Sequence, residues 1–285
     1  MTTAFRGFIG LGMVTLVIPV GLGRAADPPY RSPYRVEFRE PLVNLTGDLD
    51  RTERGNPHLE TDIPHAEWYA RRMLAGSAHW GPSARHYPEL AAAEHWSVER
   101  KRERVIAVAL RFRGYAYQHH HIPDWDPPAS WPWTPTCAGS NGRGVDCSNF
   151  TGFVYNLAFG YRLNTDVGLQ AEEAAAPGPG PHRTTRLQRV ELPSSFEERR
   201  QVLRTGDLLF IRGSPTGQVS HVVLWVGPIG RSPDGTPLIL DSTGGSIHDA
   251  TGQAIPCGIH LRPYQANSWY HASASHALRV FPDGP

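Results

Sequence analysis

The 285-residue chain is predicted to adopt an α+β fold, with helices first and a C-terminal antiparallel β-sheet after them. Apolar residues recur at helical spacing in two stretches between residues 97 and 160. From residue 206 onward the chain instead contains short runs rich in β-branched and apolar residues, separated by Gly and Pro. The 29 glycines and 26 prolines also favour loops and short strands over a helical bundle.

Residues 1–25 are predicted to be an export signal. Arg6 supplies a positive charge, residues 8–20 form an apolar run, and the small residues Gly23 and Ala25 precede a plausible cleavage site. The alternative is an uncleaved membrane anchor, although the run is short for a bilayer span. We therefore expect an exported protein, periplasmic or extracellular, that leaves the membrane once the signal is cleaved.

Residues 26–96 are expected to be an N-terminal extension. Residues 27–56 are rich in Pro, Arg and acidic residues without a sustained period, which predicts an extended, partly ordered arm. Pro64 then begins a short predicted helix that passes through Trp68 and ends near Gly76.

The predicted main domain, residues 97–285, begins with two firmer helices. Ser97 is the expected N-cap of the first, which ends at Gly114, and the second covers residues 148–159 with one wide apolar stripe. The predicted strands of the sheet are Asp207–Arg212, His221–Val226, Pro237–Asp241, Gly258–Arg262 and Ala277–Phe281.

Two segments of the main domain are predicted to lie outside helices and strands. Residues 119–136 should form a loop, because the prolines from Pro123 to Pro135 forbid regular structure. Residues 171–181 end in alternating Pro and Gly, which predicts a solvent-exposed excursion.

The charge balance argues against a nucleic-acid binder. The chain has 28 basic and 27 acidic residues and a formal net charge of +1, whereas nucleic-acid binding normally needs a clear basic excess. Three consecutive histidines, His119–His121, invite a metal site near Asp124 and Asp126. Consecutive residues of a strand point to opposite faces, however, so all three rarely bind one ion. We expect no metal and no cofactor.

Cys147 is the candidate nucleophile. It directly precedes the second predicted helix, where free backbone N–H groups and the positive end of the helix dipole favour a thiolate. The alternative is a buried structural cysteine, since Cys is often buried.

His221 and Asp241 are the candidate partners of Cys147. His221 begins a predicted strand and could face a helix packed on the sheet, and Asp241 ends the next predicted strand, from which it could orient the imidazole. The alternatives are a histidine satisfied by backbone groups and an aspartate that caps the following turn.

Three motifs together resemble the NlpC family of papain-like cell-wall cysteine peptidases. They are Gly144-Val145-Asp146-Cys147-Ser148-Asn149-Phe150, Thr205-Gly206-Asp207-Leu208-Leu209-Phe210 and Ser220-His221-Val222-Val223-Leu224-Trp225-Val226-Gly227. The resemblance covers residues 99–281 and implies a papain-like fold whose second helix carries the nucleophile. It implies Cys147 as nucleophile and His221 as general base. The third residue of the family is usually polar and often His, so Asp241 departs from the pattern.

A second departure concerns the segment before the cysteine. Members of the family usually have G-x-P-Y-x-W-G-G there, whereas this chain has Gly114-Tyr115-Ala116-Tyr117-Gln118-His119-His120-His121. Tyr117 takes the place of the family tyrosine, and Tyr117 and Ser220 are the candidate substrate-binding residues. The long loop at residues 122–142 carries Trp125, Trp131 and Trp133, which could line the cleft or pack as a cover over the domain.

The resemblance implies hydrolysis of peptidoglycan stem peptides at an amide between D-glutamate and a diamino acid. Two alternatives remain. One is a thiol acyltransferase or amidase of the same fold, and the other is a non-catalytic cell-wall-binding module, against which the retained Cys147 and His221 argue. The oligomeric state is left open.

The two further cysteines, Cys137 and Cys257, could form a disulfide, because an exported chain with three cysteines divides into one reactive thiol and one bridge. The alternative is two unpaired thiols, since sequence does not fix their separation.

Overall fold

The computed structural model describes residues 30–70, 80–128, 142–178 and 184–283. The two firmer predicted helices are present, as α3 (Val98–Leu110) and α4 (Cys147–Phe159). The Ser97 side chain caps α3 by accepting a hydrogen bond from the Arg100 N–H. Gly160 ends α4 in the left-handed conformation at φ +77°, which glycine adopts without a steric penalty. Helix α3 stops four residues before the predicted Gly114.

The strands form one six-stranded antiparallel sheet in the order β11-β8-β6-β5-β12-β4. Each predicted strand is present with shifted ends, so the α+β prediction is confirmed. Strands β6 and β8 are neighbours in the sheet, which places His221 and Asp241 on adjacent strands. The bounds are β4 Gln188–Glu191, β5 Leu208–Arg212, β6 Val219–Trp225, β8 Leu238–Thr243, β11 Gly258–Pro263 and β12 Ala274–Arg279.

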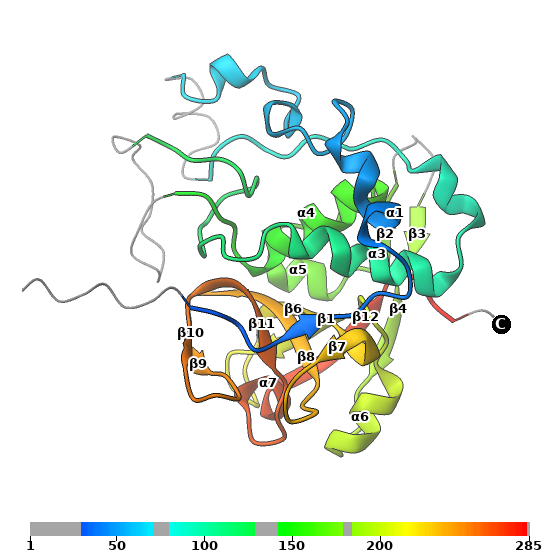
Figure 1. Ribbon diagram of the computed structural model, residues 1–285, viewed down its shortest axis with the longest axis vertical. Helices are drawn as coiled ribbons and strands as arrows, with labels where there is room; N and C mark the ends of the chain where they lie inside the picture. The colour runs from blue at the N-terminus through cyan, green and yellow to red at the C-terminus, as the bar shows by residue number, and fades with distance from the viewer. Residues whose placement is uncertain (1–29, 71–79, 129–141, 179–183, 284–285) are drawn as a thin grey trace, which may run out of the picture.

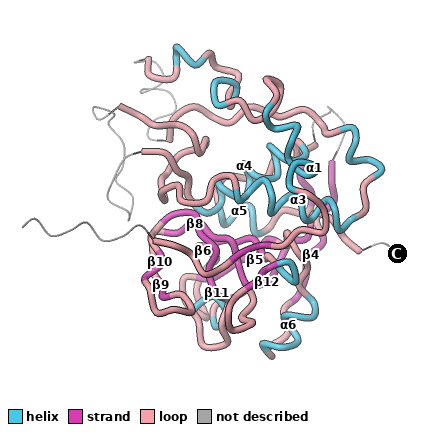
Figure 2. The backbone as a smooth tube through the Cα atoms, in the orientation of Figure 1, coloured by secondary structure: helices cyan, strands magenta, loops and turns pink. Residues whose placement is uncertain are grey.

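The sheet separates two layers of helices, as Figures 1 and 2 show. On one side lie α3, α4 and α5 (Val167–Ala171), whose apolar side chains share the larger core cluster with alternate residues of the strands. On the other side lie α6 (Phe196–Val202) and α7 (Trp269–Ala272), which cover a smaller cluster that includes Val223, Trp225, Tyr264 and Tyr270.

The extended-arm prediction for residues 27–56 is wrong in its second half. That part folds into α1 (Leu42–Thr46) and the 3-10 helix η1 (Gly47–Asp50), because Leu45 and Leu49 are fully buried there. The Asp48 carboxylate pairs with the buried Arg104 guanidinium of α3 at 2.7 Å.

The N-terminal extension contains little regular structure beyond α1. Short 3-10 helices lie at η2 (Pro57–Leu59), η3 (His65–Glu67) and η4 (Ala91–His95). Only η3 stands where the short helix after Pro64 is predicted, residues 68–70 form a turn, and the rest of that prediction lies outside the described residues. The buried Trp68 and Tyr87 nevertheless belong to the larger core cluster. The extension therefore packs on the main domain, while the boundary at residue 96 stays a prediction.

The predicted exposed excursion at residues 171–181 is wrong in part for residues 171–178, and residues 179–181 lie outside the described residues. Strand β2 (Ala175–Pro177) pairs with β3 (Thr184–Arg186), and Ala176 is fully buried. Small residues can pack beneath a hairpin, which composition alone does not reveal. The remaining short elements are β1 (Arg35–Val36), η5 (Gly227–Ile229), β7 (Gly230–Arg231), β9 (Ile247–His248) and β10 (Ala254–Ile255).

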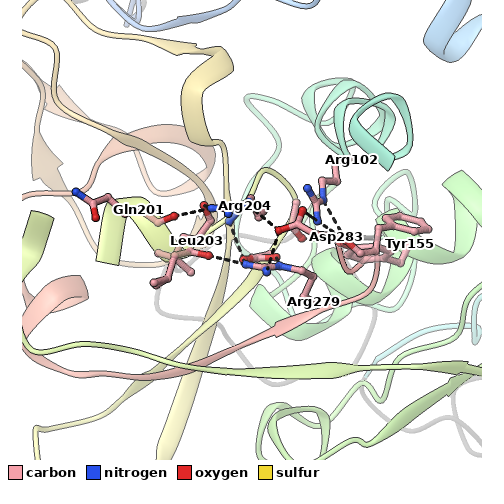
Figure 3. Close-up of polar contacts among 11 residues, drawn as sticks. Arg102, Tyr155, Gln201, Leu203, Arg204, Arg279 and Asp283 are labelled. Atoms are coloured by element: carbon pink, nitrogen blue, oxygen red, sulfur yellow. Dashed lines mark hydrogen bonds and ion pairs between the residues drawn. The ribbon is translucent and has the colours of Figure 1, made fainter. Parts of the chain in front are cut away.

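The last described residues are fixed to the domain by ion pairs (Figure 3). The Asp207 carboxylate accepts two hydrogen bonds from the Arg279 guanidinium, at 2.9 and 2.7 Å. Asp283 pairs with Arg102 at 2.8 Å and with Arg204 at 3.2 Å. The aspartate of the Gly-Asp-Leu motif therefore joins β5 to β12. Among the described helices, none is long and apolar enough to cross a membrane.

Candidate active site

Cys147 is the first residue of α4, and only 5% of its surface is exposed. The Asp146 side chain caps the helix by accepting a hydrogen bond from the Asn149 N–H at 2.9 Å. The approach to Cys147 is tightly packed, because a Cβ at Gly144 would lie 2.0 Å from the Ala116 carbonyl oxygen. Gly144 and Asp146 of the motif at residues 144–150 therefore help to fix the position of the Cys147 thiol.

His221 and Asp241 form a buried pair on adjacent strands. The imidazole Nε2 lies 2.8 Å from Asp241 Oδ1, with 6% of His221 and none of Asp241 exposed. The hydrogen bond between the imidazole and the Cys147 thiol is therefore left to Nδ1. The structure thus brings together Cys147, His221 and Asp241 in the order that a nucleophile, its base and an orienting group require.

The charges around His221 favour an imidazolium. Burial by itself lowers the pKa of His221, but the charges of Asp241 and Cys147 and their hydrogen bonds outweigh it and hold the pKa well above 6.5. Burial likewise works against the charged form of Asp241, yet His221, Arg262 and Tyr270 bring its pKa below the ordinary value. Both shifts therefore favour the oppositely charged forms of the two groups.

The strand that carries Asp241 also contacts the segment before Cys147. The Ser242 hydroxyl, on the next residue of β8, donates to the Val145 carbonyl oxygen at 2.6 Å. This hydrogen bond ties β8 to the chain two residues before Cys147. Ser242 is thus a structural contact of the site, whereas His248 is exposed on β9.

Residues 136–274 match the model of the NlpC/P60 family. This part of the chain is an NlpC/P60 domain. NlpC/P60 domains are typical of peptidoglycan hydrolases and are generally cysteine peptidases. No curated protein matches the chain.

Three solved structures are similar to the chain at low identity. An NlpC/P60 family protein from Bacillus cereus is 20% identical, over 64% of this chain and 40% of that chain, with a TM-score of 0.37. The NlpC/p60 domain of the peptidoglycan hydrolase SagA is 18% identical, over 61% and 95%, with a TM-score of 0.32. NlpC1 from Trichomonas vaginalis is 13% identical, over 66% and 48%, with a TM-score of 0.34.

Two aromatic residues at the site of the NlpC/P60 domain were not among the sequence candidates. The Trp269 ring lies 5.6 Å from the His221 ring and is 41% exposed, and the neighbouring Tyr270 donates a hydrogen bond to Asp241 Oδ2 at 2.5 Å. Both belong to α7, whose N-cap is Ser268. The signal was a serine followed by adjacent aromatic residues, but four residues are too few to show a period.

Tyr117 and Ser220 lie differently with respect to Cys147. The Ala116 N–H bonds the Arg143 carbonyl oxygen at 3.0 Å, so the segment of Tyr117 runs beside the chain that leads into α4. Ser220 is exposed, with its hydroxyl beside Gly213 at the β5–β6 turn. Among the described contacts, Ser220 takes no part in the hydrogen bonds of the pair on β6 and β8. A substrate role for either residue stays a prediction.

The three consecutive histidines, which precede the residues matched by the family model, pack separately. His119 Nδ1 lies 3.4 Å from Asp146 Oδ2, His121 Nδ1 lies 3.0 Å from Asn149 Oδ1, and His120 packs edge-on against Trp125. Within the described ranges, no group of three or more His, Cys, Asp or Glu side chains is arranged to hold a metal ion.

The long loop before Cys147 is described only in part. Trp125 is fully buried, so it packs into the core rather than lining a cleft. Trp131, Trp133 and Cys137 lie outside the described residues. Cys257 is a half-buried thiol, and its bridge with Cys137 stays a prediction.

Proposed function

We propose that the protein is an exported cysteine peptidase that hydrolyses the amide between D-glutamate and a diamino acid in peptidoglycan stem peptides. The observation that carries the proposal is the alignment of Cys147, His221 and Asp241 in an NlpC/P60 domain. A purely structural cysteine would need neither a histidine beside its thiol nor a buried carboxylate bonded to that histidine.

The proposed reaction has two steps. The Cys147 thiolate attacks the amide carbonyl, and the Cys147 backbone N–H at the start of α4 stabilises the oxyanion. The His221 imidazolium then gives its proton to the leaving amine, and a thioester remains on the enzyme. In the second step neutral His221 takes a proton from water, the hydroxide displaces the thiolate, and the acid product leaves. Asp241 keeps the ring oriented throughout.

The exposed face of Trp269 is the proposed wall of the substrate site. An indole that is 41% exposed beside a buried histidine offers apolar surface where a bound peptide can cover it. Trp269 therefore adds a candidate contact to Tyr117.

Incubation of the purified protein with peptidoglycan sacculi, followed by mass spectrometry of the muropeptides, tests the proposal. Wild-type protein should produce stem peptides that end at D-glutamate, and Cys147→Ala should produce none. Cys257→Ala is the matched control, because it removes the other cysteine of the described chain, and it should keep full activity.

Other outcomes of that experiment separate the alternatives. Transfer of the acyl group to an added amine in place of hydrolysis would indicate a thiol acyltransferase. Wild-type protein that binds sacculi without changing the muropeptides would indicate a wall-binding module. The mass of the protein recovered from outside the cytoplasm tests export, with cleavage expected after Ala25.

A further inference from the structure

The carboxylate of Asp241 has different partners on its two oxygens. Oδ1 faces the His221 imidazole at 2.8 Å. Oδ2 accepts the Tyr270 hydroxyl at 2.5 Å and lies 3.7 Å from Nε of Arg262. A carboxylate held on both oxygens cannot rotate without losing one set of contacts. The orientation of Asp241 therefore depends on Tyr270 and Arg262 as well as on His221.

Tyr270 acts on Asp241 only as a hydrogen-bond donor. Its side chain is buried, and burial, together with the charge of Asp241, raises the pKa of Tyr270 well above 10. The hydroxyl therefore keeps its proton at neutral pH. Because α7 also places Trp269 beside His221, one short turn contacts both members of the pair.

Arg262 is a fully buried cation whose charge is balanced mainly by Asp241. Its Nη2 donates to the Pro256 carbonyl oxygen at 2.6 Å, whereas Nε and Nη1 make no hydrogen bond with the described residues. A buried guanidinium without a counter-charge is strongly unfavourable, so the carboxylate 3.7 Å away stabilises it. In return, the guanidinium stabilises the ionised form of Asp241.

The other titratable group that faces Asp241 is His260, which stands opposite it in the β8–β11 ladder. Burial and the charges of Arg262 and Arg113 lower the pKa of His260 to about 4, so it is neutral near pH 7. The charged groups around Asp241 are thus His221 and Arg262. With Arg262 to balance the carboxylate, the imidazolium is available to balance the thiolate of Cys147.

We propose that Tyr270 and Arg262 are positioning residues, which hold Asp241 ionised and turned toward His221 so that the thiolate–imidazolium pair forms. The proposal rests on the proposed function only for its effect on turnover. Its effect on the reactivity of the Cys147 thiol does not depend on any substrate.

Tyr270→Phe is the first test, with Tyr264→Phe as the matched control. Both tyrosines are buried in the smaller core cluster, but the Tyr264 hydroxyl lies near Arg199 at 3.5 Å instead of Asp241. Tyr270→Phe should slow alkylation of Cys147 by iodoacetamide and lower kcat by about tenfold, with KM unchanged. Tyr264→Phe should match the wild type in both.

The pH profile of alkylation separates positioning from a merely structural role. Loss of the Tyr270 donor raises the pKa of Asp241, so Asp241 takes up its proton at a higher pH and His221 then loses its counter-charge. The acidic limb of the profile should therefore move to higher pH in Tyr270→Phe. A limb that coincides with those of wild type and Tyr264→Phe overturns the proposal.

Variants that keep or remove the positive charge at position 262 test the role of Arg262. Arg262→Lys should keep most of the alkylation rate, and Arg262→Met should shift the acidic limb in the same direction as Tyr270→Phe. If Arg262→Met does not fold, the alkylation rates of Arg262→Lys and Tyr270→Phe still test the role of the charge. Equal losses of rate in these two variants would contradict such a role. Wild-type protein without hydrolase activity, but with the predicted alkylation shifts, would reject the proposed function and keep this proposal.

Discussion

His120 and His221 are both buried histidines, yet their surroundings shift their pKa values in opposite directions. Burial, together with the neighbouring His121 and His119, lowers the pKa of His120 to about 3. His221 is buried almost as deeply, but the carboxylate of Asp241 and the Cys147 thiol hold its pKa well above 6.5. One ring packs against Trp125, and the other lies between a thiol and a carboxylate.

The difference shows that burial alone does not make a histidine a candidate base. Low dielectric surroundings disfavour the charged ring, and only an opposite charge in contact reverses that effect. Three adjacent histidines look more conspicuous in the sequence than the single His221. The side chain that distinguishes the two sites is Asp241, which comes from a different strand.

The largest expected effect is on turnover. His221→Ala should lower kcat on sacculi by about a thousandfold, because it removes the base and the counter-charge of the thiolate. His120→Phe, which replaces one packed ring with another, should keep kcat within about twofold of wild type. Steady-state rates of muropeptide release measure both. Equal losses in the two variants would remove the distinction between the two histidines.

Asp241→Asn should shift the pKa of His221 in the direction already seen for His120. With its negative partner gone, the pKa of His221 falls, since burial is then opposed only by the thiol. The alkaline limb of the pH–rate profile should move to lower pH, and kcat should fall on the order of a hundredfold. Profiles of kcat against pH measure the shift. An alkaline limb that stays in place would contradict the ion pair.

His120 should affect how stability depends on pH. In the folded protein its pKa is about 3, below the unfolded value of 6.5, so the unfolded chain binds the extra proton. The stability contributed by the neutral ring is complete above pH 6.5 and is lost as the pH falls toward 3. Between pH 6 and 4, His120→Phe should therefore lose about 1.4 kcal/mol less per pH unit than wild type.

Urea unfolding at a series of pH values measures that slope. The exposed His248 provides the control, and His248→Phe should keep the wild-type slope. If His120→Phe also keeps the wild-type slope, the folded protein binds a proton at His120 more easily than the burial of the ring implies.

The smallest expected effect is on substrate affinity. Trp269→Ala should raise KM by about three- to tenfold with little change in kcat, because the indole contacts His221 from its exposed side. Trp269→Phe should retain most of the affinity. A fall in kcat without a change in KM would instead assign Trp269 to the support of the imidazole.

The sequence predicts the parts of the fold that have a clear period. Helices α3 and α4 and the strands of the sheet follow from capping residues and apolar spacing. The segment from Leu42 to Asp50 was predicted to be extended, because it has no stripe long enough to identify, yet Leu45 and Leu49 bury themselves against α3. Ala176 likewise becomes buried through pairing of β2 with β3, which depends on residues 184–186.

The sequence also indicates the three residues of the candidate site, Cys147, His221 and Asp241, because each stands at an end of a predicted element. It does not indicate Tyr270 or Arg262. In β11 the polar His260 and Arg262 alternate with Ile259 and Leu261, which is typical of a strand with one solvated face. Here both faces are buried, and only the tertiary structure shows what covers them.

Strand β8 contacts two parts of the candidate active site at once. Asp241 and Ser242 are consecutive, so their side chains leave the strand on opposite faces, one toward His221 and the other toward the Val145 carbonyl. A displacement of β8 along its axis would move the contact with His221 and the contact with Val145 together. Strand β8 therefore helps to set the spacing between the Cys147 thiol and the His221 imidazole.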